Sequence, residues 1–108
     1  MISEYQDICC ACTAWIHEAG AIALERFGHA SATRKADRSI VTDVDHAVQA
    51  HLLGRIASAY PDHGVISEET QRAPGRHAPL DQARRVWVVD PIDGTRSYAR
   101  SFPGFCIS

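Results

Sequence analysis

The segment "VWVVDPIDGT", residues 86–95, constrains the fold most, because a fully apolar run enters an acidic turn without a break. Apolar residues that do not alternate with polar ones predict a strand buried on both faces over residues 86–89. Pro91 has a fixed φ and biases Asp90 toward extended backbone, so the strand ends rigidly. Asp93 follows three residues later, across a tight bend. The fold must therefore place two carboxylates at the end of a core strand.

Two stretches before this strand have helical patterns. Apolar residues recur at three- and four-residue steps over residues 2–27, and Ser3 with Gln6 predicts a capping box at the start. A second helix is predicted from Thr42 or Asp43 through residue 60. The other expected elements are a polar connection at 29–39, a brief β pair at 40–41, a short buried strand at 65–67, a surface loop at 70–85, one or two helical turns at 95–100 and a strand within 102–108.

Length and charge exclude several classes of protein. The 108 residues make one ordinary domain, and 45% hydrophobic with 22% charged residues are globular values. A net charge of −2 gives no basic field, so nucleic-acid binding is not expected. We see no apolar run near the roughly 20 residues that span a bilayer, and no basic region followed by an apolar core at the N-terminus. These features predict a cytoplasmic protein without a membrane partner.

The four cysteines predict no metal site. Cys9, Cys10 and Cys12 lie in the first predicted helix, and His17 is the only nearby imidazole. A zinc site would need further thiolate or imidazole partners at tight spacing. We therefore expect reduced cysteines buried in the core.

The turn after the apolar strand has the ligands for a cation and a phosphate together. Asp90 and Asp93 supply carboxylates, which Mg²⁺ prefers along with water and substrate phosphate oxygens. Gly94 allows a close approach to the backbone, and Thr95 opens a helical turn whose free N–H groups attract an anion. The alternative is a turn in which the two aspartates accept hydrogen bonds from local backbone N–H groups.

Two further acidic segments bear on this choice. Glu68 and Glu69 follow the apolar triplet "VIS", so at least one is expected at the end of a short strand, although such pairs are commonly solvated surface. The segment "KADRSIVTDVD", residues 35–45, adds Lys35 and three aspartates. Helix capping explains Asp43 readily and Asp45 less completely.

In this order and spacing, "KADRSIVTDVD", "SEE" and "WVVDPIDGTRSY" resemble the inositol monophosphatase family of Mg²⁺-dependent, lithium-sensitive phosphomonoesterases. The resemblance runs from residue 35 to the end. It implies an α/β fold, an α+β layered sandwich of the sugar-phosphatase type in which two N-terminal helices pack on a mainly antiparallel sheet. It also implies a small phosphorylated metabolite as substrate, two or three Mg²⁺ ions and a homodimer.

The same resemblance implies a set of metal ligands. Glu68 looks like a metal ligand with a catalytic role, and Glu69 like a supporting neighbour. Asp90 looks like the bridge between two Mg²⁺ ions. The backbone carbonyl of Ile92 is similar to a ligand of the first ion, and Asp93 to a ligand of the second that also contacts substrate.

The remaining implied roles concern water and phosphate. Gly94 and Thr95 resemble a backbone phosphate cradle, and the Thr95 hydroxyl paired with Asp45 resembles the group that orients the attacking water. Lys35 resembles a lysine near the metals. The substrate would be an inositol monophosphate, with histidinol phosphate, sugar bisphosphates and 3′-phosphoadenosine phosphate as alternatives.

The sequence departs from the family pattern in one respect. Family members are far longer and supply a further aspartate from a Trp-Asp motif, whereas neither Trp15 nor Trp87 precedes an acid. We therefore expect residues 1–108 to be the N-terminal part of a single such domain, with little or no activity alone. A non-catalytic binding or assembly fragment is the first alternative. A haloacid dehalogenase-like phosphatase is the second, but its D-x-D-G-T register fails here.

Overall fold

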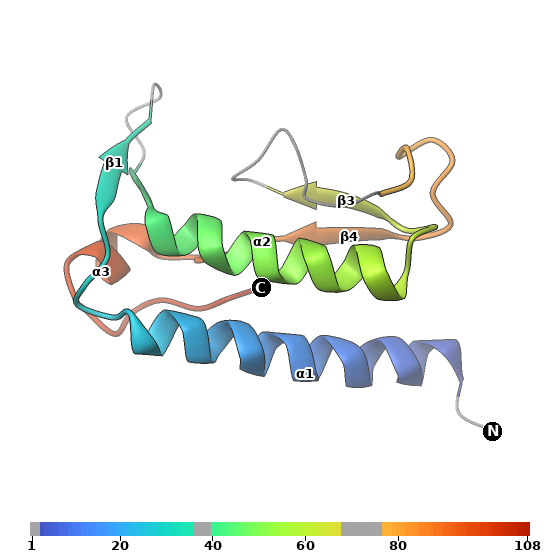
Figure 1. Cartoon of the computed structure of the whole chain (residues 1–108), viewed down its shortest axis with the longest axis horizontal. Coiled ribbons are helices and arrows are strands. Elements are labelled where there is room, and N and C mark those ends of the chain that lie inside the picture. The colour runs from blue at the N-terminus through green and yellow to red at the C-terminus, as the bar shows by residue number, and fades with distance from the viewer. Residues whose placement is uncertain (1–2, 36–39, 68–76) are drawn as a thin grey trace.

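Two antiparallel helices run along a pair of strands in the computed structural model, which describes residues 3–35, 40–67 and 77–108 (Figure 1). The elements in chain order are α1 (Glu4–Glu25), β1 (Ala32–Arg34), β2 (Ile40–Thr42), α2 (Asp43–Ala59), β3 (Gly64–Ser67), β4 (Val86–Val89) and α3 (Thr95–Ala99).

Local signals fix the starts of both long helices and the end of α1. The Ser3 side chain accepts from the Gln6 amide and the Gln6 side chain accepts from the Ser3 amide, which confirms the predicted capping box. Thr42 and Asp45 form the same reciprocal pair at the start of α2. Gly28, at φ 87°, follows α1 in the left-handed conformation that suits glycine.

The strands form two pairs with different directions. β1 pairs with β2 antiparallel, and β3 pairs with β4 parallel with Gly64 opposite Val86. The α/β class is confirmed. The described strands thus form two separate two-stranded sheets, one antiparallel and one parallel. The predicted polar connection at 29–39 also contains β1, which pairing with β2 stabilises.

The core lies between the helices and β4. Trp15, Ala19 and Ala23 of α1 occur at four-residue steps, so they share the face that packs on α2. α2 contributes a second row of buried apolar side chains, and Val89 closes the core from the strand side. The other members of this cluster, from α2, the turn after β4 and α3, are Val44, Val48, Leu52, Leu53, Ile56, Ile92 and Tyr98.

Three burial predictions are wrong: those for the strands at 65–67 and 86–89, and that for the cysteines. Ile66, in the strand predicted to be buried at 65–67, is 48% exposed. Val88 is 74% exposed and Val86 43% exposed, because the helices cover only one face of β4 in the described chain. Cys9 and Cys10 are exposed and Cys12 is half-buried, because the core face of α1 is the Trp15–Ala19–Ala23 row. All four cysteines are free thiols, as expected.

The helix α1 is long and apolar enough by length and composition to cross a membrane, with 17% of its most apolar window buried. Core helices of water-soluble proteins satisfy the same criterion. Its Trp15 row packs on α2 and β4, so we interpret α1 as a core helix.

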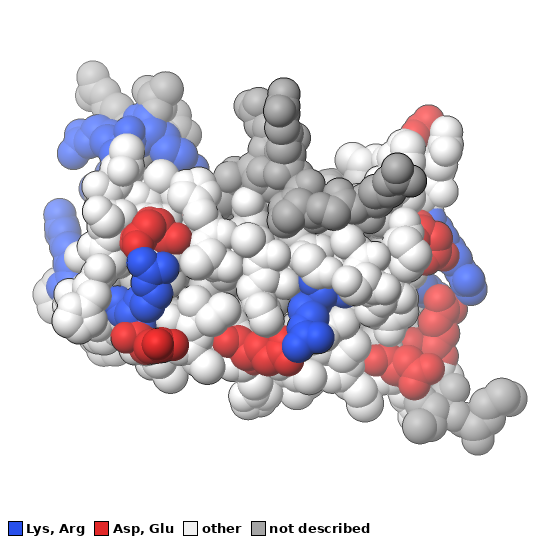
Figure 2. All heavy atoms as spheres, in the orientation of Figure 1, with Lys and Arg blue, Asp and Glu red and all other residues white. Residues whose placement is uncertain are grey.

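Salt bridges tie the helices together on the surface. Glu18 of α1 bonds His51 at 2.7 Å and Arg55 at 2.8 Å, both on α2. Arg26, at the end of α1, pairs with Asp43 at the start of α2. Figure 2 shows acidic and basic side chains interspersed over this face of the molecule.

Candidate active site

The ends of β3 and β4 lie level at one edge of the sheet. Ser67, the last residue of β3, is opposite Val89, the last residue of β4. Asp90 follows directly, with its Oδ1 atom inaccessible to solvent. Glu68 and Glu69, which follow Ser67, lie outside the described residues. The register thus places the last residues of β3 and β4, Ser67 and Val89, side by side at this edge.

The turn after β4 is held in shape by the C-terminal segment. Asp93 and Cys106 exchange two backbone hydrogen bonds, of 2.8 and 3.0 Å. Gly94 has φ 89°, and a Cβ there would lie 2.6 Å from the Gly104 carbonyl oxygen. Only glycine fits this close approach without strain. The turn therefore presents the start of α3 in one defined orientation.

A buried carboxylate from α2 reaches this turn. Asp45 is 0% exposed, and its Oδ1 accepts from the Thr95 hydroxyl at 3.0 Å. Its Oδ2 accepts from both the backbone amide of Thr42, at 2.8 Å, and the Thr42 hydroxyl. The Thr95 hydroxyl also lies 3.0 Å from the Ile92 carbonyl oxygen. The contact expected between Thr95 and Asp45 is thus present.

The other predicted residues are partly brought together. Asp93 is exposed and lines an open cleft with Gly94 and Cys106, while Asp90 is half-buried. Lys35 is half-buried at the end of β1. Among the described residues, which exclude both glutamates, no three His, Cys, Asp or Glu side chains meet closely enough to hold a metal ion.

The sequence analysis did not identify Gln49, whose side-chain amide is buried beside the site. Gln49 lies one turn after Asp45 on α2 and is 4% exposed, and its Oε1 accepts from the Ser67 hydroxyl at 2.5 Å. It therefore fixes the last residue of β3 next to the emerging chain. The available signal was a glutamine within the apolar face of the helix, four residues after an aspartate.

Hydrogen bonding and burial shift the pKa values of three groups near the site. Hydrogen bonding from the Ser31 amide, with a contribution from Arg26, lowers the pKa of Asp43. Burial raises the pKa of Tyr98, whose hydroxyl donates to the Ala23 carbonyl at 2.8 Å. Burial and the Asp93 carboxylate raise the pKa of the Cys106 thiol, which lies 3.8 Å from Asp93 Oδ2. The Tyr98–Ala23 hydrogen bond anchors α3 to α1.

The donor set suits a hard cation. Carboxylates and a backbone carbonyl are the oxygen ligands that Mg²⁺ and Ca²⁺ accept. Asp90, Ile92 and Asp93 supply them from one turn, and this turn also presents the N-terminus of α3. A fixed hydroxyl, held by a buried carboxylate, completes the arrangement.

The comparisons with known proteins agree on a family. The model described as inositol monophosphatase family matches residues 4–108. The Nus factor SuhB of Haemophilus influenzae is 36% identical over 84 residues, which are 78% of this chain and 30% of that protein. The chain thus spans about 30% of the length of the curated relatives it matches.

Solved structures share the fold. The IMPase of Thermotoga maritima is 26% identical, with a TM-score of 0.78 over 94% of this chain and 37% of that one. An IMPase/NADP phosphatase solved with Mg²⁺ and phosphate is 24% identical, with a TM-score of 0.80 over 97% and 39%. The fold class and the resemblance noted in the sequence are confirmed. This chain belongs to the inositol monophosphatase family, a family of phosphatases.

Proposed function

We propose that the chain contributes to Mg²⁺-dependent hydrolysis of a small phosphomonoester, an inositol monophosphate or a similar compound. The observation that carries this proposal is the Thr95–Asp45 contact of 3.0 Å beside the Asp90–Asp93 turn. A related protein of the same fold was solved with Mg²⁺ and phosphate, which supports the choice of cation and ligand.

The proposed site residues have separate roles in this reaction. Asp90, Asp93 and the Ile92 carbonyl would hold Mg²⁺, together with Glu68 and with Glu69 in support. Bound Mg²⁺ would lower the pKa of water and stabilise charge on the phosphoryl oxygens. Two or three ions, inhibition by lithium and a nearby role for Lys35 belong to this proposal.

The Thr95 hydroxyl orients the attacking water. Because its hydrogen is donated to Asp45, its oxygen lone pairs are left to accept a hydrogen bond from a water molecule. Two donors from Thr42 hold the Asp45 carboxylate in place, so the hydroxyl cannot rotate freely. The amides of Gly94 and Thr95 bind the phosphate. The reaction needs no covalent enzyme intermediate.

Other parts of the proposal concern the whole protein. Residues 1–108 form the N-terminal part of one domain, and a homodimer in the cytoplasm, with no nucleic-acid or membrane partner, is the expected form. The alternative is a fragment that binds cation and phosphate without turnover. A haloacid dehalogenase-like mechanism would instead phosphorylate Asp90.

Direct cation binding tests the site without requiring turnover. Calorimetric titration with Mg²⁺ in the presence of phosphate should show binding to the wild type and to Asp62→Asn, a matched change at the opposite end of β3. Asp93→Asn should weaken binding by about 100-fold or more, since it removes a ligand rather than an outer contact. Equal binding by all three proteins would remove the proposed metal site.

Phosphate release separates the two alternatives. If the chain is an enzyme, it should release phosphate from inositol monophosphate in the presence of Mg²⁺. Lithium should inhibit this release, and Asp93→Asn should abolish it. Cation binding without release, in this chain and in any longer product of the same reading frame, would support the non-catalytic fragment. A trapped phospho-aspartate at Asp90 would support the dehalogenase-like mechanism.

A further inference from the structure

Two buried polar side chains of α2 contact the chain at two places beside the candidate site. Asp45 accepts from the Thr95 hydroxyl at 3.0 Å, and Gln49 Oε1 accepts from the Ser67 hydroxyl at 2.5 Å. Asp45 and Gln49 are four positions apart, so they lie one helical turn apart on the same face of α2. This helix thus holds the start of α3 through the first contact and the end of β3 through the second.

Core packing alone does not explain the glutamine at position 49. Its side chain is only 4% exposed, and the buried residues around it on α2, Val48, Leu52 and Leu53, are apolar. Burying an amide costs free energy unless a hydrogen bond compensates for the lost water, and the Ser67 hydroxyl supplies such a bond. An apolar side chain of similar length would fill the same space without this requirement.

The Gln49–Ser67 contact also defines the register of β3 against α2. Val65 packs against the core cluster and Ser67 bonds to α2, whereas Ile66, between them, is 48% exposed. Side chains alternate between the two faces of a strand, so a slip of one residue would turn Ile66 toward α2 and Ser67 away from it. Such a slip would also move the end of the strand by about 3.3 Å. The hydrogen bond from Ser67 to Gln49 opposes this movement.

We propose that Gln49 is a positioning residue for the cation site and acts through Ser67 on the chain that leaves β3. This inference rests on the proposed function, in which Glu68 binds Mg²⁺. Glu68 lies outside the described residues, and one peptide bond joins it to Ser67. Metal–ligand distances tolerate changes of about 0.2 Å, far less than the shift of about 3.3 Å that a slip of β3 would cause. The end of β3 must therefore be held in register for a ligand there to reach the cation.

Calorimetric titration with Mg²⁺ in the presence of phosphate, on the full product of the reading frame, tests this role. Gln49→Met keeps the length of the side chain and removes the acceptor, whereas Ser67→Ala removes the donor. Each variant should bind Mg²⁺ about tenfold more weakly, the lower end of the range for groups that support a metal ligand. The double variant should also lose about tenfold rather than about a hundredfold, because both changes remove the same hydrogen bond.

Two matched variants serve as controls. Ser67→Thr keeps the hydroxyl and should retain the Mg²⁺ affinity within about twofold. Gln82→Met makes the same chemical change at an exposed position before β4 and should leave the affinity unchanged. Urea unfolding separates positioning from a purely structural role, which would lower the unfolding midpoint of Gln49→Met without changing the Mg²⁺ affinity of the folded protein.

The results distinguish failure of this inference from failure of the metal site. Wild-type Mg²⁺ affinity in both Gln49→Met and Ser67→Ala, with binding lost in Asp93→Asn, would overturn the positioning role alone. A loss of about a hundredfold in the double variant would show that the two side chains act separately, which also contradicts this role. Equal binding by the wild type and Asp93→Asn would instead remove the metal site, and the role of Gln49 with it.

Discussion

At the scale of single residues, the site depends on a few positions that admit little change. Asp45 is buried because three donors satisfy it: the Thr95 hydroxyl and two groups of Thr42. A buried carboxylate with fewer donors would be costly. Gly94 is the other such position, since its left-handed backbone and the nearby Gly104 carbonyl exclude a side chain.

Replacing Gly94 by alanine should destabilise the chain by about 1–3 kcal/mol, because the methyl group meets backbone and the residue remains at positive φ. Gly54→Ala is the matched control: a Cβ at Gly54 meets no atom within 4 Å, so this helical position should gain about 0.5–1 kcal/mol. Urea unfolding of both variants measures the difference. Equal stability of Gly94→Ala and the wild type would contradict the structure of the turn.

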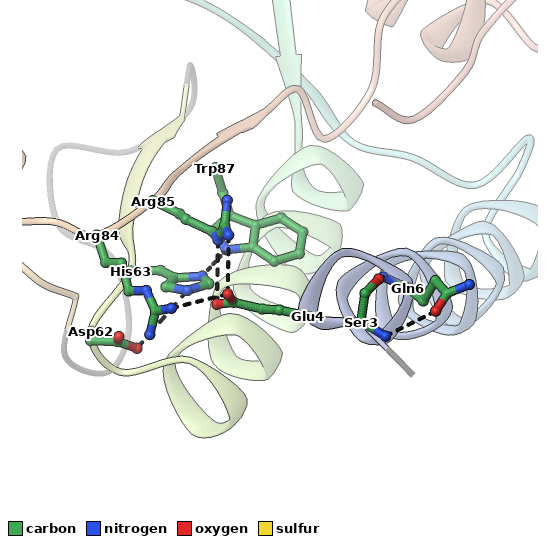
Figure 3. Close-up of polar contacts among 8 residues, drawn as sticks. All are labelled: Ser3, Glu4, Gln6, Asp62, His63, Arg84, Arg85 and Trp87. Carbon is green, nitrogen blue, oxygen red and sulfur yellow. Dashed lines mark hydrogen bonds and ion pairs between the residues drawn. The ribbon is translucent and has the colours of Figure 1, made fainter. Parts of the chain in front are cut away.

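At the scale of the elements, ion pairs connect α1 to its neighbours. Glu4 binds Arg84 at 3.0 Å and Arg85 at 3.1 Å, which ties the start of α1 to the start of β4 (Figure 3). Hydrogen bonding from Arg85 lowers the pKa of Glu4 from its ordinary value. Arg85 also lies over the Tyr5 ring, 4.6 Å from its centroid. The pairing makes this junction sensitive to acid.

The sign of this sensitivity follows from the lowered pKa. The charged form of Glu4 is favoured in the folded state, so its contribution is present above the unfolded pKa and is lost as the pH falls through the lower folded value. Glu4→Gln should therefore lose less stability than the wild type as the pH falls below about 4.3. Urea unfolding over this pH range measures the slope.

The control for this prediction is Glu25→Gln, which changes an exposed carboxylate at the other end of α1. It should lose stability with acid as the wild type does. A slope for Glu4→Gln as steep as that of the wild type would argue against the junction.

At the scale of the whole molecule, carboxylates from distant segments gather near one edge of the sheet. Asp45 comes from α2 and Asp90 and Asp93 follow β4, while β3 ends level with β4. A divalent cation held by these carboxylates would bind the folded state only, because the unfolded chain does not bring the segments together.

Millimolar Mg²⁺ should therefore raise the melting temperature of the chain, because a ligand that binds only the folded state stabilises it by mass action. KCl at the same ionic strength should not reproduce the increase, and Asp93→Asn should abolish it. Thermal unfolding, monitored by circular dichroism, measures the melting temperatures. A melting curve unchanged by Mg²⁺ would count against an assembled metal site.

The sequence by itself determined the local structure and the identity of the site segments. The capping residues of α1 and α2, the rigid end of β4 and the glycine turn follow from short-range rules, because capping and proline geometry involve residues within about four positions. The motif of the family could likewise be identified from the sequence alone.

Only the tertiary structure decided burial and pairing. The apolar composition of β4 suggested burial on both faces, but Val88 is exposed because no described segment covers that face. The contact between Asp45 and Thr95 joins residues fifty positions apart, and the Gln49–Ser67 bond depends on the placement of α2 against β3. Such contacts are set by how elements pack, which short-range patterns do not specify.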